Sequence, residues 1–116
     1  LNKLSELNIP VAILTNKPQL MTDLLIKELN SEHLFKLWIG AGKFATKPSP
    51  EGLAHCLQEL NAKPGESIMI GDHHTDLMVG EALGCDTVFC QYGLGNKGDS
   101  QPTYEISNAM ELFKLL

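Results

Sequence analysis

Three short segments of the sequence carry side chains suited to binding phosphate or a divalent cation. The apolar run VAILT ends in a hydroxyl, Thr15, and continues into Asn16. Lys47 lies in ATKPSPEG, and GDHHTDL places Asp72 and Asp76 on either side of a tight turn. A hydroxyl beside backbone N–H groups suits phosphate oxygens, and paired carboxylates suit Mg²⁺. The residue types therefore indicate phosphate chemistry, in which Lys47 would neutralise phosphate charge.

Each of these residues also has a purely structural interpretation. A threonine at a strand end commonly satisfies a turn, and a lone lysine is usually a solvated charge. Asp76 could cap the helix that follows it while Asp72 makes the turn. Two converging carboxylates without a nearby arginine repel each other unless a cation lies between them, and Gly71 permits close approach to a ligand. The sequence alone leaves both interpretations open.

The elements that must position these residues alternate between strand and helix. Short apolar runs predict strands, and a period of 3.6 residues or capping residues predict helices. Strands are expected at residues 11–15, buried on both faces, and at 37–40, 67–71 and 87–90. Helices are expected at 1–8, after Pro18, after a Ser49 cap, at 76–83 up to Gly84, and after a Ser107 cap. The helix after Pro18 places Leu20, Leu24, Leu25 and Leu29 on one face. This alternation predicts an α/β fold, a doubly wound parallel sheet with ligands beyond the carboxyl ends of its strands.

Composition narrows the class of protein. A length of 116 residues predicts one domain over 1–116, and no apolar run is long enough to span a membrane. The net charge of −5 argues against a nucleic-acid partner. All nine cations are lysines, so a phosphate site has no arginine fork to use. Three cysteines without a CxxC pair favour a reducing, cytoplasmic setting.

The order of VAILTNK, TKPSPEGL and SIMIGDHHTDLMVGEALGC resembles motifs two, three and four of the haloacid dehalogenase superfamily. Together with the tail TVFCQYGLGN, it looks most like the phosphoglycolate phosphatase group. The resemblance implies a Rossmann-like core and a magnesium-dependent phosphatase that hydrolyses small phosphorylated metabolites through an aspartyl-phosphate. By position, Thr15 and the Asn16 amide would bind phosphoryl oxygens, Lys47 would neutralise charge, Asp72 would ligate Mg²⁺, and Asp76 would support that metal site.

The chain departs from the family pattern in two places. His73 stands where relatives often carry a small hydroxyl residue, and His74 is expected to face solvent. No two aspartates are two residues apart, so the DxD of motif one, which supplies the nucleophile, is absent. The expectation is an incomplete core whose central motif-one strand and cap precede Leu1. Such a chain should be inactive alone and could self-associate through unpaired strand edges.

Two other functions remain open. Asp72, His73 and His74 spell the DHH triplet of a different phosphoesterase family, although that family's other aspartate motifs are missing. The second alternative is a non-catalytic phosphate-binding or interaction module, or a truncated product, that binds without turnover.

Overall fold

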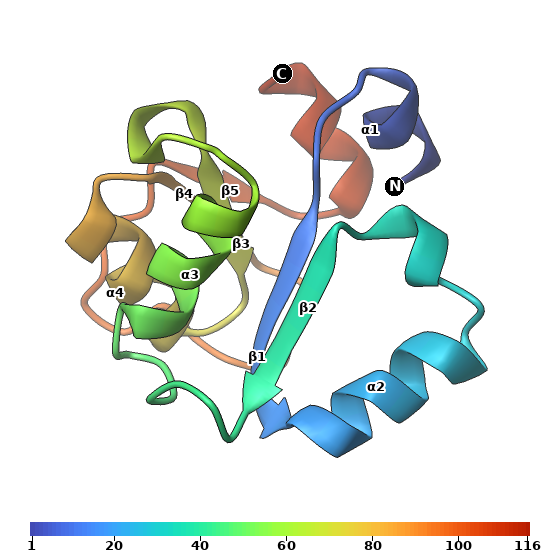
Figure 1. The fold of residues 1–116 in the computed structure, drawn as a ribbon. Coiled ribbons are helices and arrows are strands. Elements are labelled where there is room, and N and C mark those ends of the chain that lie inside the picture. The colour runs from blue at the N-terminus through green and yellow to red at the C-terminus, as the bar shows by residue number, and fades with distance from the viewer. The chain divides into compact units, whose positions relative to one another are not determined.

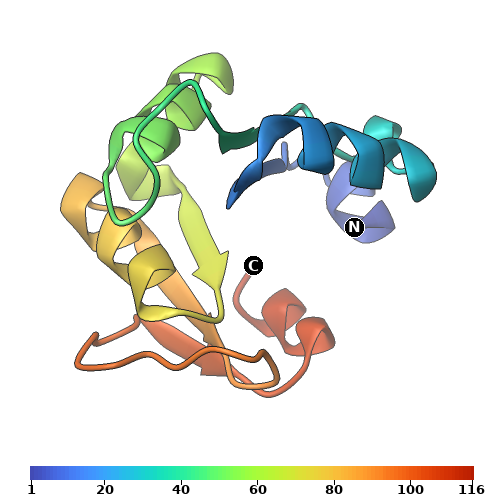
Figure 2. The same cartoon turned by 90° about the horizontal axis from the view of Figure 1, so that it is seen from below.

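The computed structural model describes residues 1–116 (Figures 1 and 2). Its parallel strands form two separate sheets, and helices connect the strands. The strands are β1 (Ala12–Pro18) paired with β2 (Leu37–Ala41), and β3 (Ile68–Gly71) paired with β4 (Asp86–Cys90), which also pairs with β5 (Tyr104–Ile106). The two sheets lie in two compact units, Leu1–Asn61 and Ala62–Leu116. The parallel pairing confirms the α/β class, and a single domain over 1–116 stays a prediction.

In the first unit, helices pack against the two-stranded sheet. Its remaining elements are α1 (Asn2–Glu6), α2 (Gln19–Glu28), the 3₁₀ turn η1 (Glu32–Leu34) and α3 (Glu51–Glu59). Both α2 and α3 contact β1 and β2. The β1–β2 register runs evenly from Ala12 opposite Leu37 to Leu14 opposite Ile39 and then shifts, so that Pro18 faces Ala41. The irregularity falls on Thr15 and Asn16, which frees this end of β1 from regular pairing.

The first unit confirms the helix after Pro18 but not the full burial of its first strand. Leu20, Leu24, Leu25 and the C-cap residue Leu29 are 44–71% exposed, and α2 buries Thr22 and Ile26. The Thr22 hydroxyl donates to the Pro18 carbonyl at 3.1 Å, which ties this side of α2 to β1. Residues 12–15 of β1 are half-buried rather than fully enclosed, because β1 has a neighbouring strand on one edge only.

A hydrogen-bonded network fixes the start of α2 against β2. Gln19 Oε1 accepts the Gly40 N–H at 2.6 Å, and Gln19 Nε2 donates to Asp23 Oδ1 at 2.9 Å. Trp38 Nε1 donates to the same oxygen at 2.9 Å. The hydrogen bonds from Gln19 and then Trp38 hold the pKa of Asp23 below its usual value. A Cβ on Gly40 would lie 2.6 Å from the Lys17 carbonyl oxygen, so this corner closes only around glycine.

The second unit places one helix on the three-stranded sheet. Besides its strands it contains η2 (Pro64–Glu66), α4 (His74–Leu83) and η3 (Ala109–Lys114). Leu77 and Val79 of α4 are fully buried. Val88 is fully buried in a separate cluster with Cys90 and Ile106, against which Leu112 and Leu115 pack. Gly84 ends α4 with a φ of 83°, which confirms the predicted left-handed stop.

The end of the chain differs from the sequence-based expectation. Strand β5 was not predicted, and the final helix is a 3₁₀ helix capped by Asn108, whose side chain accepts the Met110 N–H at 3.1 Å. The predicted cap, Ser107, instead donates its hydroxyl to Glu111 at 2.6 Å. The three cysteines are buried free thiols, and no helix is long and apolar enough to cross a membrane.

Candidate functional site

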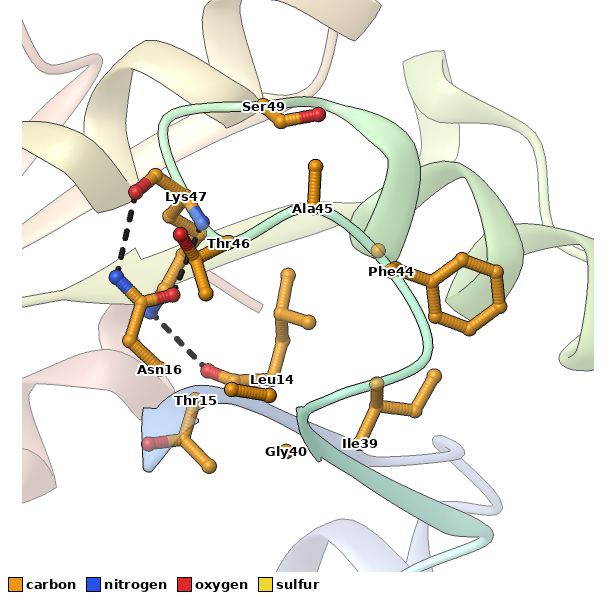
Figure 3. Close-up of a pocket in the computed structure, with 12 residues that line it drawn as sticks. Leu14, Thr15, Asn16, Ile39, Gly40, Phe44, Ala45, Thr46, Lys47 and Ser49 are labelled. Carbon is orange, nitrogen blue, oxygen red and sulfur yellow. Dashed lines mark hydrogen bonds between the residues drawn. The ribbon is translucent and has the colours of Figure 1, made fainter. Parts of the chain in front are cut away.

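The carboxyl end of β1 brings together two residues that lie 31 positions apart (Figure 3). Asn16 Oδ1 accepts the Lys47 N–H at 2.9 Å, and Asn16 Nδ2 donates to the Lys47 carbonyl at 3.2 Å. The Lys47 ammonium in turn donates to the Leu14 carbonyl at 3.2 Å. The backbone and the side chain of Lys47 are therefore both fixed to the end of this strand.

Thr15 occupies the same strand end. Its Oγ1 accepts the Lys17 N–H at 3.1 Å, which is the turn role that the sequence left as an alternative. A hydroxyl that accepts one hydrogen bond still has its own proton to donate. Thr15 can therefore satisfy the turn and also donate to an anion.

A shallow recess lies between this strand end and the loop before α3. We call it the Lys47 recess; Leu14, Thr15, Asn16, Ile39, Gly40, Ala41, Phe44, Ala45, Thr46, Lys47, Ser49 and Gly52 line it. Its volume of about 10 Å³ is at the lower limit of what admits a single water molecule. A Cβ on Gly52 would lie 2.7 Å from Leu14 Cδ1, so α3 approaches β1 closely here. The recess therefore has no room for more than one or two atoms.

In the second unit, Asp72 follows directly after β3 and is half-buried. Its Oδ2 accepts the backbone N–H of Leu94 at 3.0 Å and that of Gly95 at 3.4 Å. No hydrogen bond from the chain reaches its other oxygen, Oδ1. Carboxylate oxygens are the ligands that Mg²⁺ prefers, so Asp72 fits the role of a single protein ligand.

Asp76 is used differently. It is 6% exposed, and its Oδ2 accepts the His73 N–H at 3.3 Å as one half of a capping box at the start of α4. It also packs directly under Gly71, where a Cβ would overlap the carboxylate. The capping interpretation of Asp76 thus matches the structure, and its support of a metal stays a prediction. The chain contains no cluster of three His, Cys, Asp or Glu side chains that could hold a metal ion.

The two histidines form the rest of this turn. His73 is the N-cap of α4: its Nδ1 accepts the Thr75 N–H at 3.3 Å, a task that a hydroxyl residue commonly performs. His74 is half-buried, not solvent-facing as expected, because its ring lies against the His73 ring with centroids 4.1 Å apart. The use of Nδ1 in the cap favours a structural role for His73 over the DHH interpretation.

The contact of the loop after β4 with Asp72 was not predicted from the sequence, although glycines at positions 93 and 95 signal close backbone approach. Tyr92 lies in this loop, two residues after the end of β4. A hydrogen bond with Cys90, partial burial and the electrostatic effects of the neighbouring Cys90 and Asp72 side chains raise the pKa of Tyr92 to about 12. Tyr92 therefore stays a neutral phenol at physiological pH.

Comparisons with known proteins agree with this geometry. The profile of the haloacid dehalogenase-like hydrolases matches residues 1–90. A phosphoglycolate phosphatase of Neisseria meningitidis is 33% identical over 80% of the chain and 40% of its own length, and one of Chromobacterium violaceum is 29% identical over the whole chain and 53% of its own length. The chain therefore spans about half the length of the curated relatives it matches.

Solved structures give the same fold. The crystal structure of a haloacid dehalogenase phosphatase from Thermococcus onnurineus superposes with a TM-score of 0.89 at 26% identity, over 98% of the chain and 53% of that protein. A predicted phosphoglycolate phosphatase from Haemophilus somnus gives a TM-score of 0.91 at 21% identity, over 98% and 52%. The strand-end positions of Thr15, Lys47 and Asp72 thus lie on a fold that phosphatases use.

Proposed function

The chain belongs to the haloacid dehalogenase-like hydrolase family, and from that premise we propose that it supplies the phosphate-binding and magnesium-binding residues of a phosphatase. The observation that carries the proposal is the fixing of Lys47 to the end of β1 by Asn16 and the Leu14 carbonyl. Two of these hydrogen bonds hold the Lys47 backbone and the third holds its ammonium, whereas the ammonium of a solvated surface lysine is bound by water. An ammonium held at a strand end suits an anionic substrate.

In the proposed reaction, Thr15 donates its hydroxyl proton to a phosphoryl oxygen, and Lys47 neutralises charge that builds up on the phosphoryl group. Asp72 Oδ1 would hold Mg²⁺. When bound, Mg²⁺ supplies positive charge that lowers the repulsion between the phosphate and an attacking carboxylate. Asp76 acts at a distance, because it holds the helix start that orients the Asp72 turn.

The 116 residues contain no DxD motif. The nucleophile is therefore proposed to come from a DxD segment outside these residues. An oxygen of the first aspartate attacks phosphorus, the phosphorus–oxygen ester bond breaks, and the leaving alcohol takes a proton from the carboxyl group of the second aspartate of that segment. Water then attacks the resulting aspartyl-phosphate and releases inorganic phosphate and the free carboxylate. The substrate class is a small phosphate monoester, with phosphoglycolate favoured by the names of the relatives.

The test is complementation. The purified chain is assayed with Mg²⁺ and phosphoglycolate, alone and with a separately expressed amino-terminal part of the Chromobacterium violaceum relative that carries its DxD. We expect no turnover by the chain alone and turnover by the mixture. Asp72→Asn should abolish turnover by the mixture, and its counterpart Asp76→Asn should reduce it less. Robust Mg²⁺-dependent turnover by the purified chain alone would contradict the proposal. Phosphate binding without turnover in any mixture would favour the non-catalytic module.

A further inference from the structure

The loop after β4 folds its backbone over the carboxylate of Asp72. Two successive N–H groups, those of Leu94 and Gly95, point at the same oxygen, Oδ2, at 3.0 and 3.4 Å. Successive N–H groups that converge on one anion form a favourable site for negative charge. The loop therefore binds Asp72 through main-chain groups.

Positions 93 and 95 of this loop have no room for a side chain. A Cβ on Gly93 would overlap Asp72 Cβ, and a Cβ on Gly95 would overlap the Asp72 carbonyl oxygen. Real Cβ atoms do not approach other heavy atoms so closely, and the nearest atom met in each case belongs to the Asp72 backbone or to the root of its side chain. Both glycines are thus required for the loop to reach Asp72 in this conformation.

The Leu94 side chain has no part in the contact. It lies between the two glycines and is fully exposed. Removing it leaves the Leu94 N–H in place. Leu94→Ala is therefore a matched control that changes the loop without changing its hydrogen bonds or its backbone approach to Asp72.

We propose that Gly93 and Gly95 are positioning residues for Asp72, because their loop holds Oδ2 and directs Oδ1 toward a divalent cation. This inference rests on the proposed function, in which Asp72 is the metal ligand. A carboxylate without the loop could rotate about its χ angles and present either oxygen. The loop removes that freedom before the cation arrives, which raises affinity for the cation.

The test uses the ¹⁵N-labelled 116-residue chain and Mn²⁺, a paramagnetic ion that takes the same oxygen ligands as Mg²⁺. Mn²⁺ should broaden the amide resonances around Asp72, and Asp72→Asn should remove the effect. In Gly95→Ala, the apparent Mn²⁺ affinity should fall by about tenfold or more, as for other groups that orient a metal ligand. In Leu94→Ala it should stay within about twofold of the unchanged chain, since the hydrogen bonds persist.

Amide hydrogen exchange gives a second reading that needs no change in a glycine. The Leu94 and Gly95 amides should exchange about tenfold faster or more in Asp72→Ala, because their acceptor is gone. Equal exchange rates in the two chains would overturn the inference, even if Gly95→Ala fails to fold. Unchanged Mn²⁺ affinity in a folded Gly95→Ala would overturn it and leave the proposed function standing. An absence of Asp72-dependent Mn²⁺ binding in the unchanged chain would overturn both.

Discussion

Lys47→Ala should be the most informative single change in the first unit. The Lys47 ammonium is held 3.2 Å from the Leu14 carbonyl oxygen, at the mouth of the Lys47 recess. At a separation of 4 Å, one pair of opposite charges near a protein surface interacts by about 4 kcal/mol, and by about 1 kcal/mol in bulk water. Because the Lys47 side chain is half-buried, we expect the interaction of its ammonium with the phosphoryl group in the transition state to contribute about 2 to 4 kcal/mol. This corresponds to a loss of about 30- to 1,000-fold in kcat/KM.

The assay is phosphoglycolate hydrolysis by the complemented enzyme, with folding checked by circular dichroism. The matched control is Lys43→Ala, because Lys43 is exposed and its ammonium lies 5.5 Å from the Phe44 ring centroid, away from Asn16. We expect Lys43→Ala to stay within about twofold of the unchanged enzyme. An equal loss in both variants would refute the reasoning, since general positive charge would then suffice. A loss below about threefold in Lys47→Ala would refute the assigned interaction.

Three further predictions concern stability and pH. Gly40→Ala should destabilise the chain by about 3 kcal/mol in urea unfolding, because its Cβ would meet backbone atoms; the control Gly65→Ala, with no atom within 4 Å of the added Cβ, should stay within about 0.5 kcal/mol. The lowered pKa of Asp23 stabilises the chain above the ordinary value of 3.8, and this stability should disappear as pH falls through the lowered pKa, as followed by Trp38 fluorescence. The raised pKa of Tyr92 means that the folded chain holds its proton more tightly, so stability should fall as pH rises from 10 to about 12, and Tyr92→Phe should flatten that decline.

The strands and the strand-end positions could be predicted from the sequence, because they depend on local signals. Apolar runs located β1 to β4 to within a few residues, and Gly84 located the end of α4. The motif order also identified Thr15, Lys47 and Asp72 as candidates before any geometry was available. These features follow from residues close to one another in the chain.

Features that depend on distant partners could not be predicted. The hydrogen bonds between Asn16 and Lys47 join segments 31 positions apart, and the loop contact on Asp72 spans 22 positions. Gln19 and Thr22 fix α2 by hydrogen bonds that the period of its leucines does not show. Ser107 was predicted to be a helix cap, but its hydroxyl donates to the Glu111 carboxylate instead. In each case the polar side chain could bond to several partners, and the tertiary structure determines which of them lies within hydrogen-bond distance.

The division into two units also separates charge. Residues 1–61 contain six lysines and six carboxylates, whereas residues 62–116 contain three lysines and eight carboxylates. The entire net charge of −5 therefore belongs to the unit that carries Asp72. Long-range attraction of a divalent cation to that unit is screened by salt, with a Debye length of about 10 Å at 0.1 M ionic strength. Under the proposed function, phosphate would meet an electrically balanced unit, so its binding would depend on the placement of the Lys47 ammonium and less on ionic strength.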